Sequence, residues 1–151
     1  MSAPPSPLRV LVVDDDASIR LVVRTAFDDA EVLEAADGRE ALALLEREPL
    51  DVVLLDVMMP GVDGYSVLEA LRASDFHALV PVLLVTARNT AVDRVRAWRG
   101  GADGFITKPF DVDDLVDRVR QVVARSGAER VAIRAEELAR AGLRHAADAR
   151  R

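Results

Sequence analysis

Residues 51–64 read DVVLLDVMMPGVDG, and this stretch decides the expected fold. Its unbroken apolar run, VVLL, is typical of a strand buried on both faces of a parallel sheet, because strands with one wet face alternate apolar and polar residues. The run ends in one carboxylate, Asp56, and the proline and glycines that follow favour a loop. The stretch therefore predicts a buried strand that delivers an acid to the edge of a sheet.

Similar apolar runs occur along the chain, and each is followed by a segment with helical spacing. The expected strands cover 8–13, 31–35, 51–55, 81–85 and 104–107, and the expected helices cover 18–27, 39–48, 65–73, 90–98 and 111–125. This alternation predicts an α/β fold, with a doubly wound, five-stranded parallel sheet covered by helices on both faces. Ligands of such sheets bind at the carboxyl ends of the strands.

The two ends of the chain depart from this alternation. Residues 1–7 hold three prolines, so we expect a disordered arm before a domain at 8–125. Residues 126–151 have high helix propensity and are expected to form a C-terminal helical extension and not a second domain. The expected apolar stripe of this helix is thin: Val131, Ala135, Leu138 and Ala141. Three roles stay open for it: a dimerising or partner-binding segment, the start of a linker, and a plain tail.

Composition excludes several classes of site. The 151 residues include no cysteine, which excludes disulfides, a thiolate nucleophile and thiolate metal ligands. No apolar run approaches the roughly 18 residues of a membrane span, so we expect a cytoplasmic protein with no membrane partner. Residues 1–124 carry 13 basic and 22 acidic side chains, and 125–151 carry 7 and 4, so no DNA binding is expected.

Polar side chains follow the expected strands. They are Asp14, Asp15 and Asp16 after the first strand, Asp56 after the third, Thr86 after the fourth and Lys108 after the fifth. Acids brought together from different strands repel one another unless a cation binds among them. Oxygen ligands with room for water suit Mg²⁺, with Asp15 and Asp56 as the main ligands and Asp14 binding directly or through water. Asp16 is expected to cap the first helix.

A hydroxyl and an ammonium beside a metal-bound carboxylate are what a phosphoryl group requires. We therefore expect Asp56 to be the nucleophile, with Thr86 and Lys108 contacting the phosphoryl oxygens. Lys108 is the only lysine in the chain, against 19 arginines, and a compact ammonium reaches a buried oxyanion more readily than a planar guanidinium. The sequence leaves open whether the bond between Lys108 and Pro109 is cis or trans.

Four motifs, in their order and spacing, resemble the receiver domain of two-component response regulators. They are LVVDDD (11–16), LLDVMMPGVDG (54–64), VTA (85–87) and GADGFITKPF (101–110). The resemblance implies a flavodoxin-like fold with strand order 2-1-3-4-5. It also implies these roles: Asp56 as phosphoacceptor, Asp14 and Asp15 as the acidic metal-binding pair, Met58 as a backbone carbonyl ligand of Mg²⁺, Thr86 as switch hydroxyl, Lys108 as phosphoryl contact, and Phe105 as aromatic switch residue.

From this resemblance we expect a stand-alone response regulator, similar to the single-domain chemotaxis regulators. It would be a phosphoacceptor that assists its own phosphorylation and dephosphorylation, and not an enzyme. The expected partners are a sensor histidine kinase or histidine phosphotransfer protein, an unknown output protein bound on the helix 4, strand 5 and helix 5 surface, and a second copy in a phosphorylation-dependent homodimer. Two alternatives stay open: a phosphorelay intermediate, and a receiver fragment of a larger regulator.

Four residues near the site carry finer hypotheses. Ile19 is expected to face away from the apolar stripe of the first helix, where it would suit docking of a kinase. Met58 and Arg88 lie two residues beyond Asp56 and Thr86, beside the path of an attacking water, and are expected to lengthen the life of the phosphoryl group. For Phe105, a role as ordinary core packing competes with the switch role.

Overall fold

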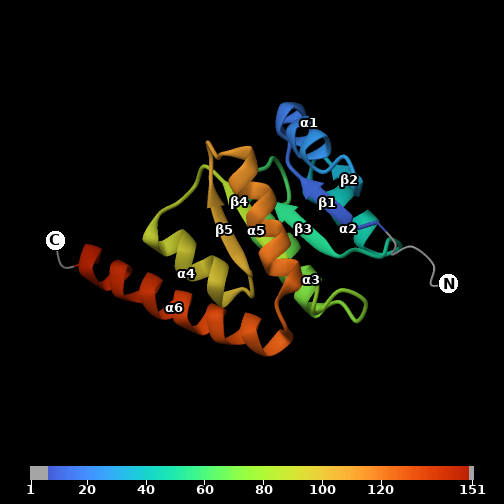
Figure 1. Cartoon of the computed structure of the whole chain (residues 1–151). Coiled ribbons are helices and arrows are strands. Elements are labelled where there is room, and N and C mark those ends of the chain that lie inside the picture. The colour runs from blue at the N-terminus through green and yellow to red at the C-terminus, as the bar shows by residue number, and fades with distance from the viewer. Residues whose placement is uncertain (1–6, 150–151) are drawn as a thin grey trace.

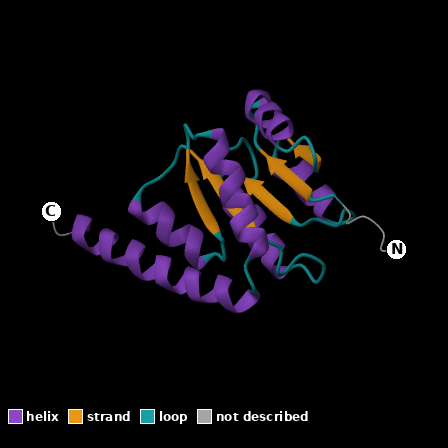
Figure 2. Cartoon of the chain, viewed as in Figure 1, coloured by secondary structure: helices purple, strands orange, loops and turns teal. Residues whose placement is uncertain are grey.

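The computed structural model describes residues 7–149 and shows one parallel sheet between two layers of helices (Figures 1 and 2). The strand order is β2-β1-β3-β4-β5, so the expected flavodoxin-like fold is confirmed. The strands are β1 (Arg9–Val13), β2 (Glu31–Ala35), β3 (Val52–Leu55), β4 (Val82–Thr86) and β5 (Gly104–Thr107). The helices are α1 (Ala17–Ala26), α2 (Gly38–Leu45), α3 (Gly64–Ala73), α4 (Ala91–Arg99), α5 (Val112–Ala124) and α6 (Gly127–Ala149). The expected arm at 1–7 lies outside the described residues, except for Pro7.

The apolar strands divide their side chains between two buried clusters, one on each face of the sheet. Val10 and Val12 of β1 pack with α1 and α5, whereas Leu11 and Val13 of the same strand pack with α2, α3 and α4. This division explains why the strands read as continuous apolar runs, because side chains on both faces are removed from water. The sheet is therefore packed against helices on both faces.

α6 is the longest helix and lies alongside α4 (Figure 1). The extra C-terminal helix is therefore confirmed, but its expected apolar stripe is wrong at the N-terminal end. Val131 is 62% exposed, and the inward side of the helix begins instead with Arg130 and Arg134, which both bond to Asp103. Further along, Ala141 is buried as expected. Across residues 7–149, no helix combines the length and apolar character needed to cross a membrane.

Candidate functional site

The sheet delivers two acids to its carboxyl edge through backbone hydrogen bonds that continue beyond the strands. The amide of Asp14 donates to the carbonyl of Ala35 at 3.0 Å, and the amide of Asp56 donates to the carbonyl of Val13 at 3.0 Å. Both side chains are buried, whereas Asp15, next along the chain, is exposed. Asp16 accepts a hydrogen bond from the amide of Ser18 and caps α1, as its position in the sequence predicts.

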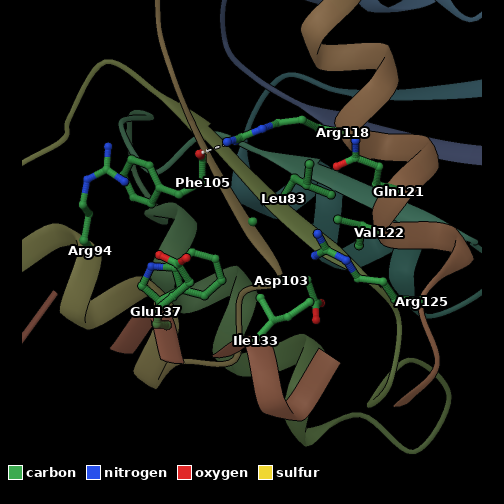
Figure 3. A pocket seen from close by; sticks show the side chains of 12 residues that line it. Leu83, Arg94, Asp103, Phe105, Arg118, Gln121, Val122, Arg125, Ile133 and Glu137 are labelled. Carbon is green, nitrogen blue, oxygen red and sulfur yellow. Dashed lines mark hydrogen bonds between the residues drawn. The ribbon is translucent and has the colours of Figure 1, made fainter. Parts of the chain in front are cut away.

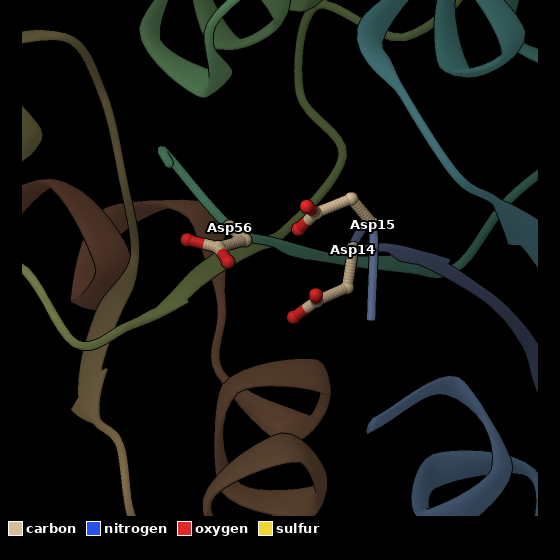
Figure 4. Close-up of side chains that lie close together, drawn as sticks. All are labelled: Asp14, Asp15 and Asp56. Carbon is tan, nitrogen blue, oxygen red and sulfur yellow. The ribbon is translucent and has the colours of Figure 1, made fainter. Parts of the chain in front are cut away.

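Asp14, Asp15 and Asp56 form a carboxylate cluster at this edge (Figure 4). Each offers one oxygen, and these three oxygens lie within 4.8 Å of one another. The donors are all hard oxygens, and the exposed position of Asp15 leaves the cluster open to solvent on one side. Such a donor set fits a hard divalent cation that keeps part of its water shell.

Lys108 brings the positive charge to the cluster. Its Nζ lies 2.6 Å from Oδ2 of Asp14 and 2.9 Å from Oδ2 of Asp56. Burial acts to lower the pKa of Lys108, but its hydrogen bonds with the two carboxylates outweigh burial and raise the pKa above its usual value, so the ammonium stays charged at neutral pH. Burial raises the pKa of Asp14, although its hydrogen bond with Lys108 acts in the opposite direction.

Thr86 ends β4 and is completely buried beside Lys108. The amide of Lys108 donates to the carbonyl of Thr86 at 2.9 Å, so the two residues are joined through their backbones. The hydroxyl oxygen of Thr86 accepts a hydrogen bond from the amide of Arg88 at 3.2 Å. The peptide bond between Lys108 and Pro109 is cis. The structure thus brings the hydroxyl that ends β4, the ammonium that follows β5 and the acids that follow β1 and β3 to one edge.

The loop after Asp56 holds the carboxylate in place. The amide of Met58 donates to Oδ1 of Asp56 at 2.9 Å, while Oδ2 accepts from Lys108. Gly64, the first residue of α3, lies so close to this loop that a Cβ atom there would clash with the carbonyl of Asp56 and the Cα of Val57. Sequence reasoning took Gly64 for ordinary turn chemistry and missed this role, which only the packing of α3 against the loop reveals.

Further roles were expected for four residues near the site: Ile19, Met58, Arg88 and Phe105. Ile19 is half-buried and lines a small cavity with Val23 and Asp56, so its expected position on the opposite side of α1 is wrong; its docking role stays a prediction. The guanidinium of Arg88 pairs with Asp93 at 2.9 Å. Phe105 is buried beneath the guanidinium of Arg94, which lies 4.6 Å from the ring centroid. The roles expected for Met58, Arg88 and Phe105 stay predictions.

The geometry of this edge agrees with comparisons to known proteins. The response regulator receiver domain family matches residues 10–120. The chain belongs to this family. It is similar to the chemotaxis protein CheY4 of Vibrio cholerae, with a TM-score of 0.74 and 34% identity over 78% of this chain and 99% of that one. It is also similar to the BeF3-activated DrrB receiver domain, with a TM-score of 0.72 and 28% identity over 79% of this chain and 99% of that one.

Curated relatives of this receiver are named as transcriptional regulators. The transcriptional regulatory protein TrcR of Mycobacterium tuberculosis is 42% identical over 80% of this chain and 47% of its own length. The DNA-binding dual master transcriptional regulator RpaA of Synechocystis is 38% identical over 78% of this chain and 50% of its own length. The chain therefore spans about half the length of the curated relatives that it matches.

These names correct the expectation that DNA binding is absent. That expectation came from the acidic balance of residues 1–124, which describes the surface of the receiver. Net charge describes only the residues that are counted, and the named relatives are about twice as long as the segment they share with this chain. The charge of a receiver is thus no guide to whether the regulator that contains it binds DNA.

Proposed function

We propose that residues 8–125 form a phosphate-accepting receiver unit in which Asp56 takes up a phosphoryl group, and that 126–151 form a helical extension to it. The observation that carries the proposal is the position of Asp56, whose two carboxylate oxygens are held separately by the Met58 amide and the Lys108 ammonium. Family membership supports the same activity. The phosphodonor would be a phosphohistidine of a kinase or a small acyl phosphate.

In the proposed reaction, one carboxylate oxygen of Asp56 attacks the phosphorus atom and forms an O–P bond. The bond from phosphorus to the donor breaks at the same time, and its electron pair leaves with the donor, as acetate if the donor is acetyl phosphate. Lys108 stays charged throughout and is placed to follow the added negative charge, because its Nζ already contacts Asp56. Fixed positions of the nucleophile and the ammonium account for much of the expected rate enhancement.

The acidic residues Asp14, Asp15 and Asp56 would hold Mg²⁺, together with the backbone carbonyl of Met58. When bound, this ion would neutralise charge on the phosphoryl oxygens and orient the phosphodonor. The chain's own contribution is to bring the three carboxylates together and to leave Asp15 exposed at the entrance.

After transfer, we propose that the hydroxyl of Thr86 turns towards the new phosphoryl oxygens and that Phe105 repositions in response. Thr86 is buried beside Lys108, and Phe105 lies on β5, the strand that leads directly to Lys108. A charge added at Asp56 would thereby reach the surface formed by α4, β5 and α5, which we call the output face. A local charge that favours one of two packings is a recurrent form of molecular switch.

Intact-mass measurement after incubation with acetyl phosphate and Mg²⁺ tests the proposal. We expect one added phosphoryl group, lost when Asp56→Asn replaces the acceptor or when a chelator removes the ion. Asp63→Asn is a matched control, because Asp63 caps α3 in the same loop but stands outside the carboxylate cluster. A phosphoryl group retained in Asp56→Asn would contradict the assignment of the acceptor.

A further inference from the structure

α6 covers part of the output face. A cavity of ≈ 180 Å³ lies between the four elements, with Arg94 from α4, Phe105 from β5, Arg118 from α5 and Glu137 from α6 among its lining residues (Figure 3). Beside it, Ala141 of α6 belongs to the same buried apolar cluster as Trp98 of α4. In Figure 1 α6 lies alongside α4 and extends beyond it at both ends. A partner that binds this part of the output face would meet α6 first.

Charged contacts with Asp103 hold the N-terminal half of α6. Asp103, just before β5, is 3% exposed, and its carboxylate accepts hydrogen bonds from Arg130 at 2.8 and 2.9 Å and from Arg134 at 2.8 Å. The same carboxylate accepts from Arg72 of α3 at 3.0 Å and from the amide of Val82 at 3.0 Å. We call Asp103 and these three arginines the Asp103 cluster.

Two other features fix the start of the helix. Arg130 donates a further hydrogen bond to the carbonyl of Leu79 at 2.7 Å, which ties α6 to the loop before β4. Ser126 and Glu129 form a capping box: the Ser126 hydroxyl accepts from the Glu129 amide at 3.1 Å, and the Glu129 carboxylate accepts from the Ser126 amide at 3.0 Å. α6 therefore begins at a defined point and in a defined direction.

β5 connects the Asp103 cluster to the phosphoryl-acceptor site. Asp103 precedes this four-residue strand, Phe105 lies within it and Lys108 follows it. The carbonyl of Phe105 accepts from Arg118 of α5 at 2.9 Å, and its ring packs under Arg94 of α4. Any movement of Lys108 or Phe105 that follows a new charge at Asp56 must therefore be accommodated by the same short strand whose other end holds α6.

We propose that α6 is an intramolecular cover of the output face, held closed by Arg130 and Arg134 on Asp103, and that phosphoryl transfer to Asp56 loosens it. The coupling rests on the proposed function, whereas the closed cover is independent of it. A partner helix that uses the output face competes with α6 in the unphosphorylated chain. Phosphorylation raises the affinity of that partner by weakening its resident competitor.

Hydrogen exchange of the full chain, read by mass spectrometry, tests the inference. In the double variant Arg130→Ala/Arg134→Ala we expect α6 amides to exchange at least about tenfold faster than in wild type, because the buried ion pairs that hold the helix are lost. Arg140→Ala is the matched control, because within residues 7–149 Arg140 pairs only with Glu136 and Glu137 of its own helix, and it is exposed. Unchanged exchange in β3 peptides would show that the receiver of the double variant stays folded. If the double variant does not fold, the single variant Arg134→Ala replaces it in the same measurement.

Incubation with acetyl phosphate and Mg²⁺ tests the coupling in the same samples. We expect faster α6 exchange in wild type once the intact mass shows an added phosphoryl group, and no change in Asp56→Asn. Phosphoryl uptake with unchanged α6 exchange would overturn the coupling and leave the proposed function standing. Absence of uptake would overturn both. Exchange in the double variant equal to that of wild type would show that the arginines do not hold the cover and would overturn the inference at its first step.

Discussion

At the carboxyl end of β5, the ammonium of Lys108 contacts two carboxylates of a cluster of three, whereas at the amino end the carboxylate of Asp103 contacts three guanidinium groups. The two ends differ in how fully their acids are bonded. Asp103 accepts from three arginines and a backbone amide and has little capacity left. Asp56 accepts from Met58 and Lys108 only, among the described residues, and Asp15 is exposed.

This difference separates a structural charge cluster from a reactive one. A saturated carboxylate surrounded by cations has no further bond to offer, and its removal would leave buried cations unpaired. A group of carboxylates with too little positive charge gains from any cation that arrives, and this is what makes it suited to a metal and a phosphoryl group. Asp14, Asp56 and Asp103 are similarly buried, so their bonding and not their exposure distinguishes the two ends at these three acids.

The largest effect is expected from Asp103→Asn. Burial already lowers the pKa of Arg72 to about 10 despite the nearby Asp103, and the substitution would leave this guanidinium charged and uncompensated. We expect the free energy of unfolding to fall by about 3–5 kcal/mol, measured by urea denaturation. Asp29→Asn is the control: Asp29 pairs with Arg120 at 3.8 Å on the surface, and its loss should cost about 0–1 kcal/mol. Equal losses of unfolding free energy in the two variants would show that the Asp103 cluster contributes no more than a surface ion pair.

The second effect is on the rate at the other end of β5. Lys108→Ala removes the ammonium that contacts Asp14 and Asp56, and we expect phosphoryl uptake from acetyl phosphate to slow by about 100-fold, because a positioned charge is lost from the transition state. Intact mass against time gives the rate. Arg120→Ala, a surface cation, should leave it unchanged. An unchanged rate in Lys108→Ala would contradict a role of Lys108 in phosphoryl uptake.

A third prediction concerns pH. Burial acts to raise the pKa of Asp103, but hydrogen bonds from Arg130, Arg134 and the Val82 amide outweigh it and hold the pKa below the usual 3.8. Since the folded pKa is the lower one, the ionised carboxylate stabilises the fold above pH 3.8, and this contribution is lost as pH falls through the folded pKa. We therefore measure the free energy of unfolding of wild type and Asp103→Asn by urea denaturation at several pH values. The difference between the two should be constant from neutral pH down to about pH 3.8 and should narrow below it. A difference that narrows already near neutral pH would contradict the depressed pKa.

The smallest effect is expected at the entrance to the site. Met58→Asn with Arg88→Glu should shorten the lifetime of the phosphoryl group a few-fold, because smaller or acidic groups would admit and orient an attacking water. Met58 is 53% exposed, so the substitution should leave the core intact. The decay of phosphorylated mass after removal of the donor gives the lifetime. An unchanged decay rate would contradict the hypothesis.

The sheet and its acidic edge could be predicted because each depends on local sequence. Continuous apolar runs give strands buried on both faces, and parallel order then brings Asp14, Asp56 and Lys108 to one edge, as the structure shows. The close approach of Gly64 to Asp56 could not be predicted in the same way. It depends on where α3 packs, and no local pattern distinguishes a glycine required by packing from one that only forms a turn.

The inward side of α6 could not be predicted, because hydropathy assigns every arginine to the solvent-exposed side of a helix. The inward residues at helical spacing include Arg130, Arg134, Leu138 and Ala141, and two of these four are charged. Arg130 and Arg134 can face inward because the carboxylate of Asp103 pairs with them. Asp103 lies 27 residues before Arg130 in the chain, so no local sequence pattern reveals this pairing. The sequence contains both partners, but only the fold pairs them.

β5 is also the last strand of the sheet, and its outer side has no strand beside it among the described residues. An open strand edge offers backbone groups that pair readily with another chain and lead to aggregation. Here the strand has only four residues, and Arg118 already occupies the carbonyl of Phe105 at its centre. The strand that carries Phe105 is thus too short and too well bonded to recruit a foreign strand, and the repositioning that we propose for Phe105 would not expose the protein to aggregation through this edge.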